Sequence, residues 1–314
     1  MPLRRRPIVL RNWVNKMAAP VKLLTRPFRS ESDFQVRRAG IIIKKNHPPA
    51  DIFTERLKGW LDDKKIDITI NEILPDLDIL IIAGGDGTLL HVAEQAARYS
   101  IPVIGINLGN LGFLTELTEQ EALPALEKII NGSVSVENRM MLKARISREV
   151  RGLHPTEYRY ALNEVVISKG TLDRVMQLST RANQDFITTY KADGLIFSTP
   201  TGSTAYNLSA GGPLVYPGLA SILVTPICPF MLSSRPILLP PETRLSTCID
   251  NGPGCYSAKI IIDGQSDWDM QEGDILEIEV AEHPLLLITS PHRDYFSILR
   301  NKLHWGITQS VRNL

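Results

Sequence analysis

One carboxylate, Asp86, lies in a glycine-rich turn at residues 84–88 that follows the aliphatic run at 77–83. Apolar residues recur at helical spacing after the turn, so we expect a helix from about residue 88. A strand, a glycine turn and a helix N-terminus together form a phosphate site, because unpaired N–H groups and the helix dipole face the turn. A carboxylate there is costly unless a metal or a substrate hydroxyl joins it, and a general base for phosphoryl transfer meets that condition.

Two common phosphate-binding motifs do not fit this turn. It lacks the lysine of G-x-x-x-x-G-K-[ST], and Leu90 stands where G-x-G-x-x-G needs its last glycine. A lone Gly-Asp-Gly would most simply be a turn or a helix cap. The buried strand before it and the helix after it favour the catalytic interpretation of Asp86.

A second polar stretch spans residues 191–212, where an apolar strand leads into a turn rich in hydroxyl groups. Hydroxyls and free N–H groups suit a polar heterocycle or a diphosphate, and Tyr206 could stack on a ring. Ordinary helix capping is the structural alternative, and it would use Thr201, Ser203 or Thr204. Seven hydroxyl side chains within 198–209 exceed what capping needs.

A third polar site is the pair Asn163 and Glu164, inside a strand expected at 158–168. Buried polar residues in a strand are costly unless they have partners. One of the two could instead simply face solvent.

The elements before residue 134 alternate between strands and helices. We expect strands at 39–43, 66–70, 77–83 and 101–106, and helices at 51–63, after 88 and after 118. Ile52, Leu57, Trp60 and Leu61 are expected to face the core, and Thr118 with Glu121 has the spacing of a capping box. This alternation predicts an α/β domain with a doubly wound, mostly parallel sheet. Its ligand edge lies at the strands' carboxyl ends, where the glycine-rich segments 84–88 and 105–113 both fall.

From residue 134 the pattern changes to short segments rich in β-branched residues, which predicts an all-β second domain. Its strands are expected at 140–146, 158–168, 174–180, 187–191, 257–262, 275–280 and 284–288, and a helix at 292–303 is expected to pack back on the first domain. We therefore divide the chain into a basic extension at 1–38, an α/β domain at 39–133, a β-rich dinucleotide-binding domain at 134–290 and a C-terminal helix at 291–314.

Composition limits the class of protein. With 43% hydrophobic and 22% charged residues the chain is typical of a globular protein, and prolines break its longest apolar stretch. Its three cysteines show no C-x-x-C pair, which disfavours both a disulfide framework and a zinc site. A reducing, cytoplasmic location is therefore expected. Residues 1–38 hold ten basic side chains against two acidic ones, a net +8, so the remainder carries −7 of the total +1.

A basic N-terminus of this kind is typical of a transit peptide, a tail that binds membranes or nucleic acid, a disordered extension or a misassigned start. Its four prolines interrupt an amphipathic helix, so we expect disorder. We expect neither nucleic acid nor a membrane as a partner.

Taken together, these motifs resemble those of the NAD kinases, which transfer the γ-phosphoryl group of ATP to the adenosine ribose 2′-hydroxyl of NAD. The resemblance covers about residues 39–305. It is carried by the turn 84–88, by 107–113, by 163–164, by 193–206, by 225–229 and by 263–265. The glycine turn alone also occurs in diacylglycerol and sphingosine kinases and, loosely, in phosphofructokinases. Its combination with Thr-Pro-Thr-Gly-Ser-Thr-Ala-Tyr at 199–206 is specific.

The resemblance implies that Asp86 is the proton acceptor and that ATP with Mg²⁺ is the donor. It implies nucleotide contacts from Gly84, Gly85, Gly87, Thr88, Asn110, Phe113, Asn163, Glu164, Lys191, Asp193, Thr201, Thr204, Ala205, Tyr206, Ser209 and Gln265. A homo-oligomer, dimer or tetramer, is also implied. Two positions depart from many relatives: Lys191 replaces an arginine, which turns a bidentate phosphate contact into a point charge, and Phe230 replaces a histidine.

Two other functions fit parts of the pattern. A lipid kinase would share the glycine turn but would need an apolar acyl-binding cleft instead of the hydroxyl-rich stretch. A non-catalytic NAD(P)-binding regulator would bind dinucleotide without turnover, which the intact Asp86, Asn163 and Glu164 argue against. The sequence does not decide between NAD and NADH, or between ATP and polyphosphate.

Overall fold

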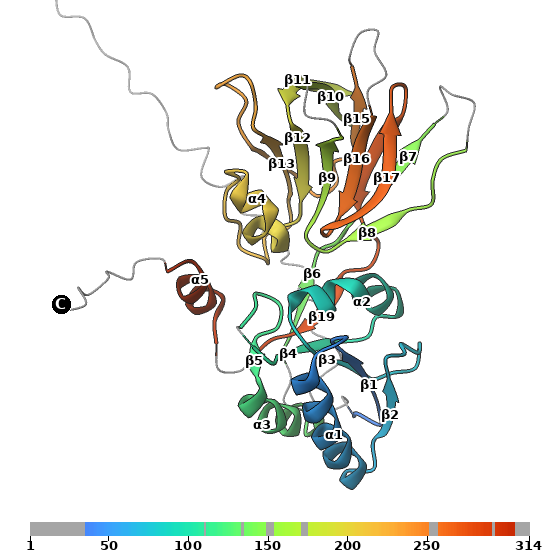
Figure 1. The fold of residues 1–314 in the computed structure, drawn as a ribbon, viewed down its shortest axis with the longest axis vertical. Helices are drawn as coiled ribbons and strands as arrows, with labels where there is room; N and C mark the ends of the chain where they lie inside the picture. Colours follow the sequence, from blue (N-terminus) through green and yellow to red (C-terminus); the bar gives the residue numbers. More distant parts are fainter. Residues whose placement is uncertain are drawn as a thin grey trace, which may run out of the picture.

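An α/β part and a part built from antiparallel sheets are stacked along the long axis of the molecule (Figure 1). The computed structural model describes residues 35–109, 111–132, 135–148, 154–170, 175–250, 257–290 and 293–304, apart from the side chains of 266 and 267. This architecture confirms the predicted fold class. In the described part of the chain, no helix combines the length and the apolar character that crossing a membrane requires.

The first sheet has the strand order β2-β1-β3-β4-β19-β6, with β5 added beside β4. Its first strands are β1 (Arg38–Ile43), β2 (Asp67–Ile70), β3 (Ile79–Ala83), β4 (Val103–Asn107) and β5 (Leu117–Thr118). These five pair in parallel. Every residue of β3 and β4 is buried, which explains why both are continuous aliphatic runs rather than alternating ones.

Three helices cover this sheet: α1 (Pro48–Asp63), α2 (Asp86–Tyr99) and α3 (Glu119–Ile130). The capping box of Thr118 and Glu121 is present at the start of α3, as predicted. The prediction for Ile52 is wrong, because this side chain is 73% exposed. The buried face of α1 carries Phe53, Leu57 and Leu61, and a neighbouring position in a helix lies about 100° around the axis from that face.

Two six-stranded antiparallel sheets make up the second part. One contains β11 (Asp185–Ala192), β10 (Met176–Ala182), β15 (Leu245–Ile249), β18 (Ile275–Val280), β7 (Leu142–Ser147) and β8 (Arg159–Ala161). The other contains β14 (Ile237–Leu239), β13 (Ile222–Ile227), β12 (Gly194–Ser198), β9 (Glu164–Lys169), β16 (Ser257–Ile262) and β17 (Gln265–Gln271). Leu178 of β10 and Phe197 of β12 belong to one shared hydrophobic core between the sheets.

The structure corrects two strand predictions. The segment expected as one strand at 158–168 forms β8 and β9, which belong to different sheets. The segment at 284–288, expected in the antiparallel part, forms β19 (Leu285–Ile288) of the first sheet, between β4 and β6 (Val136–Arg139). Residue periodicity reports burial of a strand and not its partners, so neither error was visible in the sequence. The domain boundaries stay a prediction.

The chain's last described helix, α5 (Tyr295–Leu303), is tied to both parts of the molecule. Arg293, just before it, donates two hydrogen bonds to the Glu121 carboxylate of α3, at 2.6 and 2.8 Å. The rings of Tyr295 and Phe296 contact the ring of Tyr216, which lies between β12 and β13 in the second part. These contacts hold the start of α5 across the boundary between the two parts.

Candidate active site at the boundary between the two parts

Asp86 is the first residue of α2, and its carboxylate is held by a loop that follows β4. Oδ2 accepts the N–H of Phe113 at 2.8 Å. Oδ1 accepts the N–H groups of Leu114 and Thr115, at 3.2 and 2.9 Å, and the Thr115 hydroxyl at 2.8 Å. Oδ2 accepts one hydrogen bond from the described residues, so one of its two lone pairs is left for a ligand.

The glycine at position 112 makes this arrangement possible. A Cβ on Gly112 would lie 1.9 Å from Asp86 Oδ1, so any side chain there would push the carboxylate away. Thr115 is in turn fixed by Asn107, whose Nδ2 donates to its hydroxyl oxygen at 2.9 Å. The two glycine-rich segments predicted to share one sheet edge are thus joined through Asp86.

On the other side of the boundary, Asp263 organises the segment that contains Asn163 and Glu164. Its carboxylate accepts the backbone N–H groups of Leu162, Asn163 and Glu164, at 2.8, 2.8 and 3.0 Å. Asp263 and Gly264 both have positive φ, 46° and 81°, in the two-residue turn between β16 and β17. That conformation is the tight hairpin turn that Asp-Gly favours, and it directs Asp263 at the gap between β8 and β9.

Glu164 lies beside this turn with a side chain that is only 6% exposed. Its Oε2 has no hydrogen-bond partner among the described residues. Burial, and then the neighbouring Asp263 carboxylate, raise the pKa of Glu164 to about 8, against a smaller opposing effect of the Tyr206 N–H. At neutral pH this side chain is therefore a neutral acid that can donate a hydrogen bond.

The hydroxyl-rich stretch divides into a structural half and an accessible half. Buried Thr199 donates to the Leu162 carbonyl at 2.6 Å, and buried Ser203 exchanges hydrogen bonds with the backbone of Val215. These two hydroxyls therefore hold distant backbone in place, and they are not helix caps, since the short helices at 201–204 and 206–209 have no side-chain cap hydrogen bond. Thr201 is buried and its hydroxyl lacks a partner among the described residues. Thr204 and Ala205 are half-buried, and Tyr206 and Ser209 are exposed, in or next to the short helices η2 (Thr201–Thr204) and α4 (Tyr206–Ser209).

This stretch packs directly against the Asn163 segment. A Cβ on Gly202 would lie 2.2 Å from the Asn163 carbonyl oxygen, so only glycine allows the approach. The structure thus brings together Asn163, Glu164, Thr201 and the backbone of Tyr206.

Two other predicted residues are arranged differently. Asp193 forms an ion pair with Lys169 at 2.6 Å, and Lys191 is exposed at the end of β11, where its carbonyl accepts the N–H of Phe230 at 2.8 Å. Phe230 is 76% exposed. Asn110 lies outside the described residues.

A side-chain hydrogen bond joins the two halves of the site. Gln265 Nε2 and His91 Nδ1 are 2.6 Å apart, linking the β16–β17 hairpin to the second turn of α2. Next to this contact is a small polar cavity of about 270 Å³, lined among others by Arg159, Tyr160 and Asp263. Asp86 and Asp263 thus belong to elements in direct contact across the boundary.

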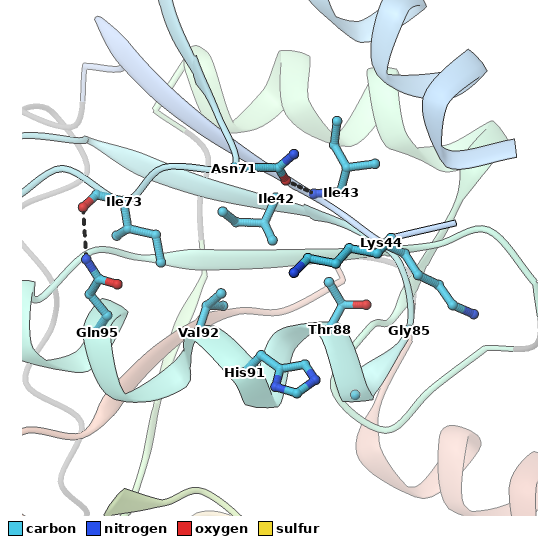
Figure 2. Close-up of a pocket in the computed structure, with 12 residues that line it drawn as sticks. Ile42, Ile43, Lys44, Asn71, Ile73, Gly85, Thr88, His91, Val92 and Gln95 are labelled. Atoms are coloured by element: carbon cyan, nitrogen blue, oxygen red, sulfur yellow. Dashed lines mark hydrogen bonds between the residues drawn. The ribbon is translucent and has the colours of Figure 1, made fainter. Parts of the chain in front are cut away.

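A larger cavity of about 880 Å³ opens on the α/β part beside the glycine turn (Figure 2). It is lined by Ile42, Ile43, Lys44, Lys45, Asn71, Ile73, Gly85, Gly87, Thr88, His91, Val92 and Gln95. Of these, only the two glycines and Thr88 are predicted site residues. Lys44 and Lys45 follow directly on β1, so the rule that ligands bind at the carboxyl ends of parallel strands would have found them.

Comparison with known proteins identifies relatives over nearly all of the described chain. Residues 69–134 match the family model of the ATP-NAD kinase N-terminal domain, and residues 162–290 match that of the ATP-NAD kinase C-terminal domain. The NAD kinase of Syntrophotalea carbinolica is 39% identical over 290 residues, covering 86% of this chain and 99% of that protein. The NAD kinase of Syntrophobacter fumaroxidans is 40% identical over 286 residues, with the same coverage.

Two solved structures share the fold. Yeast NADH kinase complexed with NADH aligns with a TM-score of 0.79 at 23% identity, covering 89% of this chain and 90% of that one. An NAD kinase from Archaeoglobus fulgidus in complex with ATP aligns with a TM-score of 0.67 at 26% identity, covering 85% of this chain and 98% of that one.

Proposed function

The chain belongs to the ATP-NAD kinase family and phosphorylates NAD with ATP, and on that premise we propose which of its residues perform the transfer. The observation that carries the proposal is that two groups of predicted site residues meet across one boundary. The Asp86 turn and the Asp263 hairpin are joined by the contact between His91 and Gln265. The phosphoryl donor is assigned to the first half and the dinucleotide to the second.

Asp86 is assigned as the proton acceptor for the adenosine ribose 2′-hydroxyl. Three donors fix Oδ1 and one fixes Oδ2, so the second lone pair of Oδ2 is the position at which the hydroxyl would bind. A fixed carboxylate takes the proton as the oxygen attacks phosphorus, which is the role of a general base in such transfers. The loop at 113–115 prevents the carboxylate from rotating away between turnovers.

The dinucleotide is assigned to the segment that Asp263 organises. Glu164, as a neutral acid, would donate a hydrogen bond to it, and Thr201 would provide a hydroxyl that has no protein partner. Its other contacts are proposed from Phe113, Asn163, Asp193, Thr204, Ala205, Tyr206, Ser209 and Gln265, with Lys191 as a point charge. The exposed Tyr206 ring offers a surface for stacking on a base.

The donor phosphates are assigned to the N-terminus of α2. Gly85, Gly87 and Thr88 line the large cavity there together with Lys44 and Lys45, so the positive end of the helix dipole and two cations would face a polyphosphate chain. Mg²⁺ would be held mostly by phosphate oxygens and water, as this ion prefers, with Asp86 as the adjacent carboxylate. When bound it would neutralise phosphate charge. No cluster of three or more metal-ligating side chains occurs among the described residues, which fits an ion that arrives with its nucleotide.

A coupled assay tests the assignment. Purified protein is incubated with ATP and Mg²⁺, and with NAD, NADH, sphingosine or diacylglycerol as acceptor, while NADP and NADPH are measured enzymatically. NADP formation dependent on ATP is expected. Phosphorylation of a lipid instead would support the lipid kinase alternative, and dinucleotide binding without turnover would support a regulator.

The assembly and location of the protein are also part of the proposal. We propose a homo-oligomer, dimer or tetramer, because Phe230, Met231 and Leu232 are 76, 51 and 86% exposed on one segment, which is unusual for a monomer. Light scattering of the purified protein measures this. Cys228 and Cys248 are free thiols, which supports a cytoplasmic location of the protein. Cell fractionation tests this location.

A further inference from the structure

The loop that holds the Asp86 carboxylate is itself held from both sides. On the side of β4, Asn107 donates to the Thr115 hydroxyl oxygen at 2.9 Å. The N–H of Gly112 donates to the Thr115 carbonyl at 3.2 Å, which closes the loop into a turn. The next residue, Glu116, connects the loop to a distant part of the chain.

Glu116 makes this connection through its backbone and its side chain. Its carbonyl oxygen accepts Nη1 of Arg293 at 2.7 Å, and its Oε2 accepts the N–H of Ser290 at 2.9 Å. The Glu116 residue is only 6% exposed. Burying an acid is costly, and Glu116 is not among the proposed nucleotide contacts. Its burial therefore serves the position of the loop.

Arg293 brings the loop and α3 together through one planar group. Its Nη1 and Nη2 donate to the two carboxylate oxygens of Glu121, at 2.8 and 2.6 Å, while Nη1 also donates to the Glu116 carbonyl. Glu121 accepts the N–H of Thr118 as well, so it is fixed in the first turn of α3. A guanidinium held by two parallel bonds directs its remaining donors rigidly. The position of residue 116 is thus fixed relative to α3.

A shift at residue 116 would reach Asp86 directly. The three residues before it, 113–115, supply every hydrogen bond that the Asp86 carboxylate accepts within the described part of the chain. Proton transfer depends steeply on where the base lies, and a displacement of about 1 Å can cost about 10²-fold in rate. Contacts that hold residue 116 therefore bear on the rate although they lie outside the reacting groups.

We propose that Glu116 and Arg293 are positioning residues for Asp86, which hold the loop at 113–115 and through it the carboxylate in the place where it accepts the proton. The proposal rests on the proposed function, because it takes Asp86 as the general base. It requires no contact of either residue with a nucleotide.

Arg293→Leu tests the first of the two residues. It removes the donor to the Glu116 carbonyl and should lower kcat between about fivefold and 10²-fold. The KM for ATP should change less than about twofold, because the proposed phosphate contacts at 85–88 and at Lys44 and Lys45 are left intact. Steady-state kinetics at a temperature where the variant is folded, as shown by thermal unfolding, measures both quantities.

Two variants of Glu116 separate its hydrogen bond from its charge. Glu116→Leu removes the acceptor for the Ser290 N–H and should lower kcat at least about fivefold. Glu116→Gln keeps a side-chain oxygen for that N–H and should retain most of the kcat that Glu116→Leu loses. If Arg293→Leu does not fold, this pair decides the matter, and equal kcat values in the two variants would overturn the proposal.

A double variant shows whether Arg293 acts through Asp86. Independent effects on kcat multiply, whereas two residues that act as one unit do not. Adding Arg293→Leu to Asp86→Asn should therefore lower the remaining kcat less than about twofold. A further loss as large as that of Arg293→Leu alone would assign Arg293 a merely structural role.

Arg56→Leu is the matched control. Arg56 pairs with Glu119 at 3.1 Å, in the same first turn of α3, so an ion pair to this turn is lost while the contacts of Glu116 stay. Its kcat should equal that of the parent. A folded Arg293→Leu variant with the parent kcat would overturn the proposal. If Asp86→Asn itself turns over near the parent rate, the proposed role of Asp86 fails, and that result is distinct from the others.

Discussion

Asp86 and Glu164 are both carboxyl side chains at the boundary between the two parts, and their surroundings are opposite. Four hydrogen-bond donors surround Asp86, which is only partly buried. Glu164 is almost fully buried, one of its oxygens has no partner among the described residues, and it faces another acid, Asp263. Donors stabilise a charge, whereas burial beside a second acid removes it. One site thus contains an acceptor and a potential donor made from similar side chains.

The largest effect expected is from removing the charge at Asp86. Asp86→Asn should lower kcat about 10²- to 10⁴-fold, or roughly 3–5 kcal/mol of barrier, with NAD affinity retained. Steady-state kinetics and calorimetric titration with NAD measure the two quantities. Thr115→Val is the companion variant: it removes one of the donors to Oδ1 and should cost less. If Asp86→Asn turns over near the parent rate, Asp86 is not the base.

Ionisation of Glu164 should make the stability of the folded protein depend on pH. Its pKa is about 8 in the folded protein against 4.5 as the ordinary value, so the folded state keeps a proton that the unfolded state loses. The free energy of unfolding should therefore fall as pH rises from about 4.5 to 8, by up to about 1.4 kcal/mol per pH unit. Glu164→Gln, which cannot ionise, should lack this contribution. Denaturant titrations of both proteins across this range measure the difference, and parallel curves would refute a neutral Glu164.

The close contact at Gly112 tests whether the position of Asp86 matters as much as its charge. Gly112→Ala would place a Cβ against Asp86 Oδ1 and should lower kcat/KM at least about tenfold and stability by about 1–3 kcal/mol. Gly59→Ala on α1 is the matched control, since a Cβ there meets no atom within 4 Å. It should leave activity unchanged and raise stability by about 0.5–1 kcal/mol. Equal activities in both variants would show that Asp86 can shift without loss.

Glu121 is a carboxylate whose pKa is lowered by its surroundings, whereas that of Glu164 is raised. Its hydrogen bonds with Arg293, first among several causes, lower the pKa of Glu121 to about 2. This stabilisation is complete above about pH 4.5 and is lost as pH falls toward 2. Arg293→Leu should cost about 1–2 kcal/mol at neutral pH, after allowance for partial exposure. The difference from the parent should shrink from pH 5 to pH 2, and a difference independent of pH would contradict the ion pair.

Much of the fold and part of the site followed from local sequence. The aliphatic runs at 77–83 and 101–106 predicted buried parallel strands, and the capping box at Thr118 predicted the start of α3 within a residue. These signals are local because burial on both faces and capping need only neighbouring residues. The glycine turn likewise showed where phosphate should bind, since its backbone conformation and the helix after it are encoded within a few positions.

What only the tertiary structure decided is which distant groups meet. No local pattern announces that β19 returns to the first sheet, that Asp263 holds the segment at 162–164, or that Ser203 serves the backbone of Val215. The cavity beyond Thr88 is likewise assembled from β1, the segment after β2 and α2. Burial and the neighbouring acid, which together make Glu164 neutral, arise from residues about 100 positions apart. The sequence determined which side chains could act, and long-range packing decided their charge, their partners and which of them remain available to a ligand.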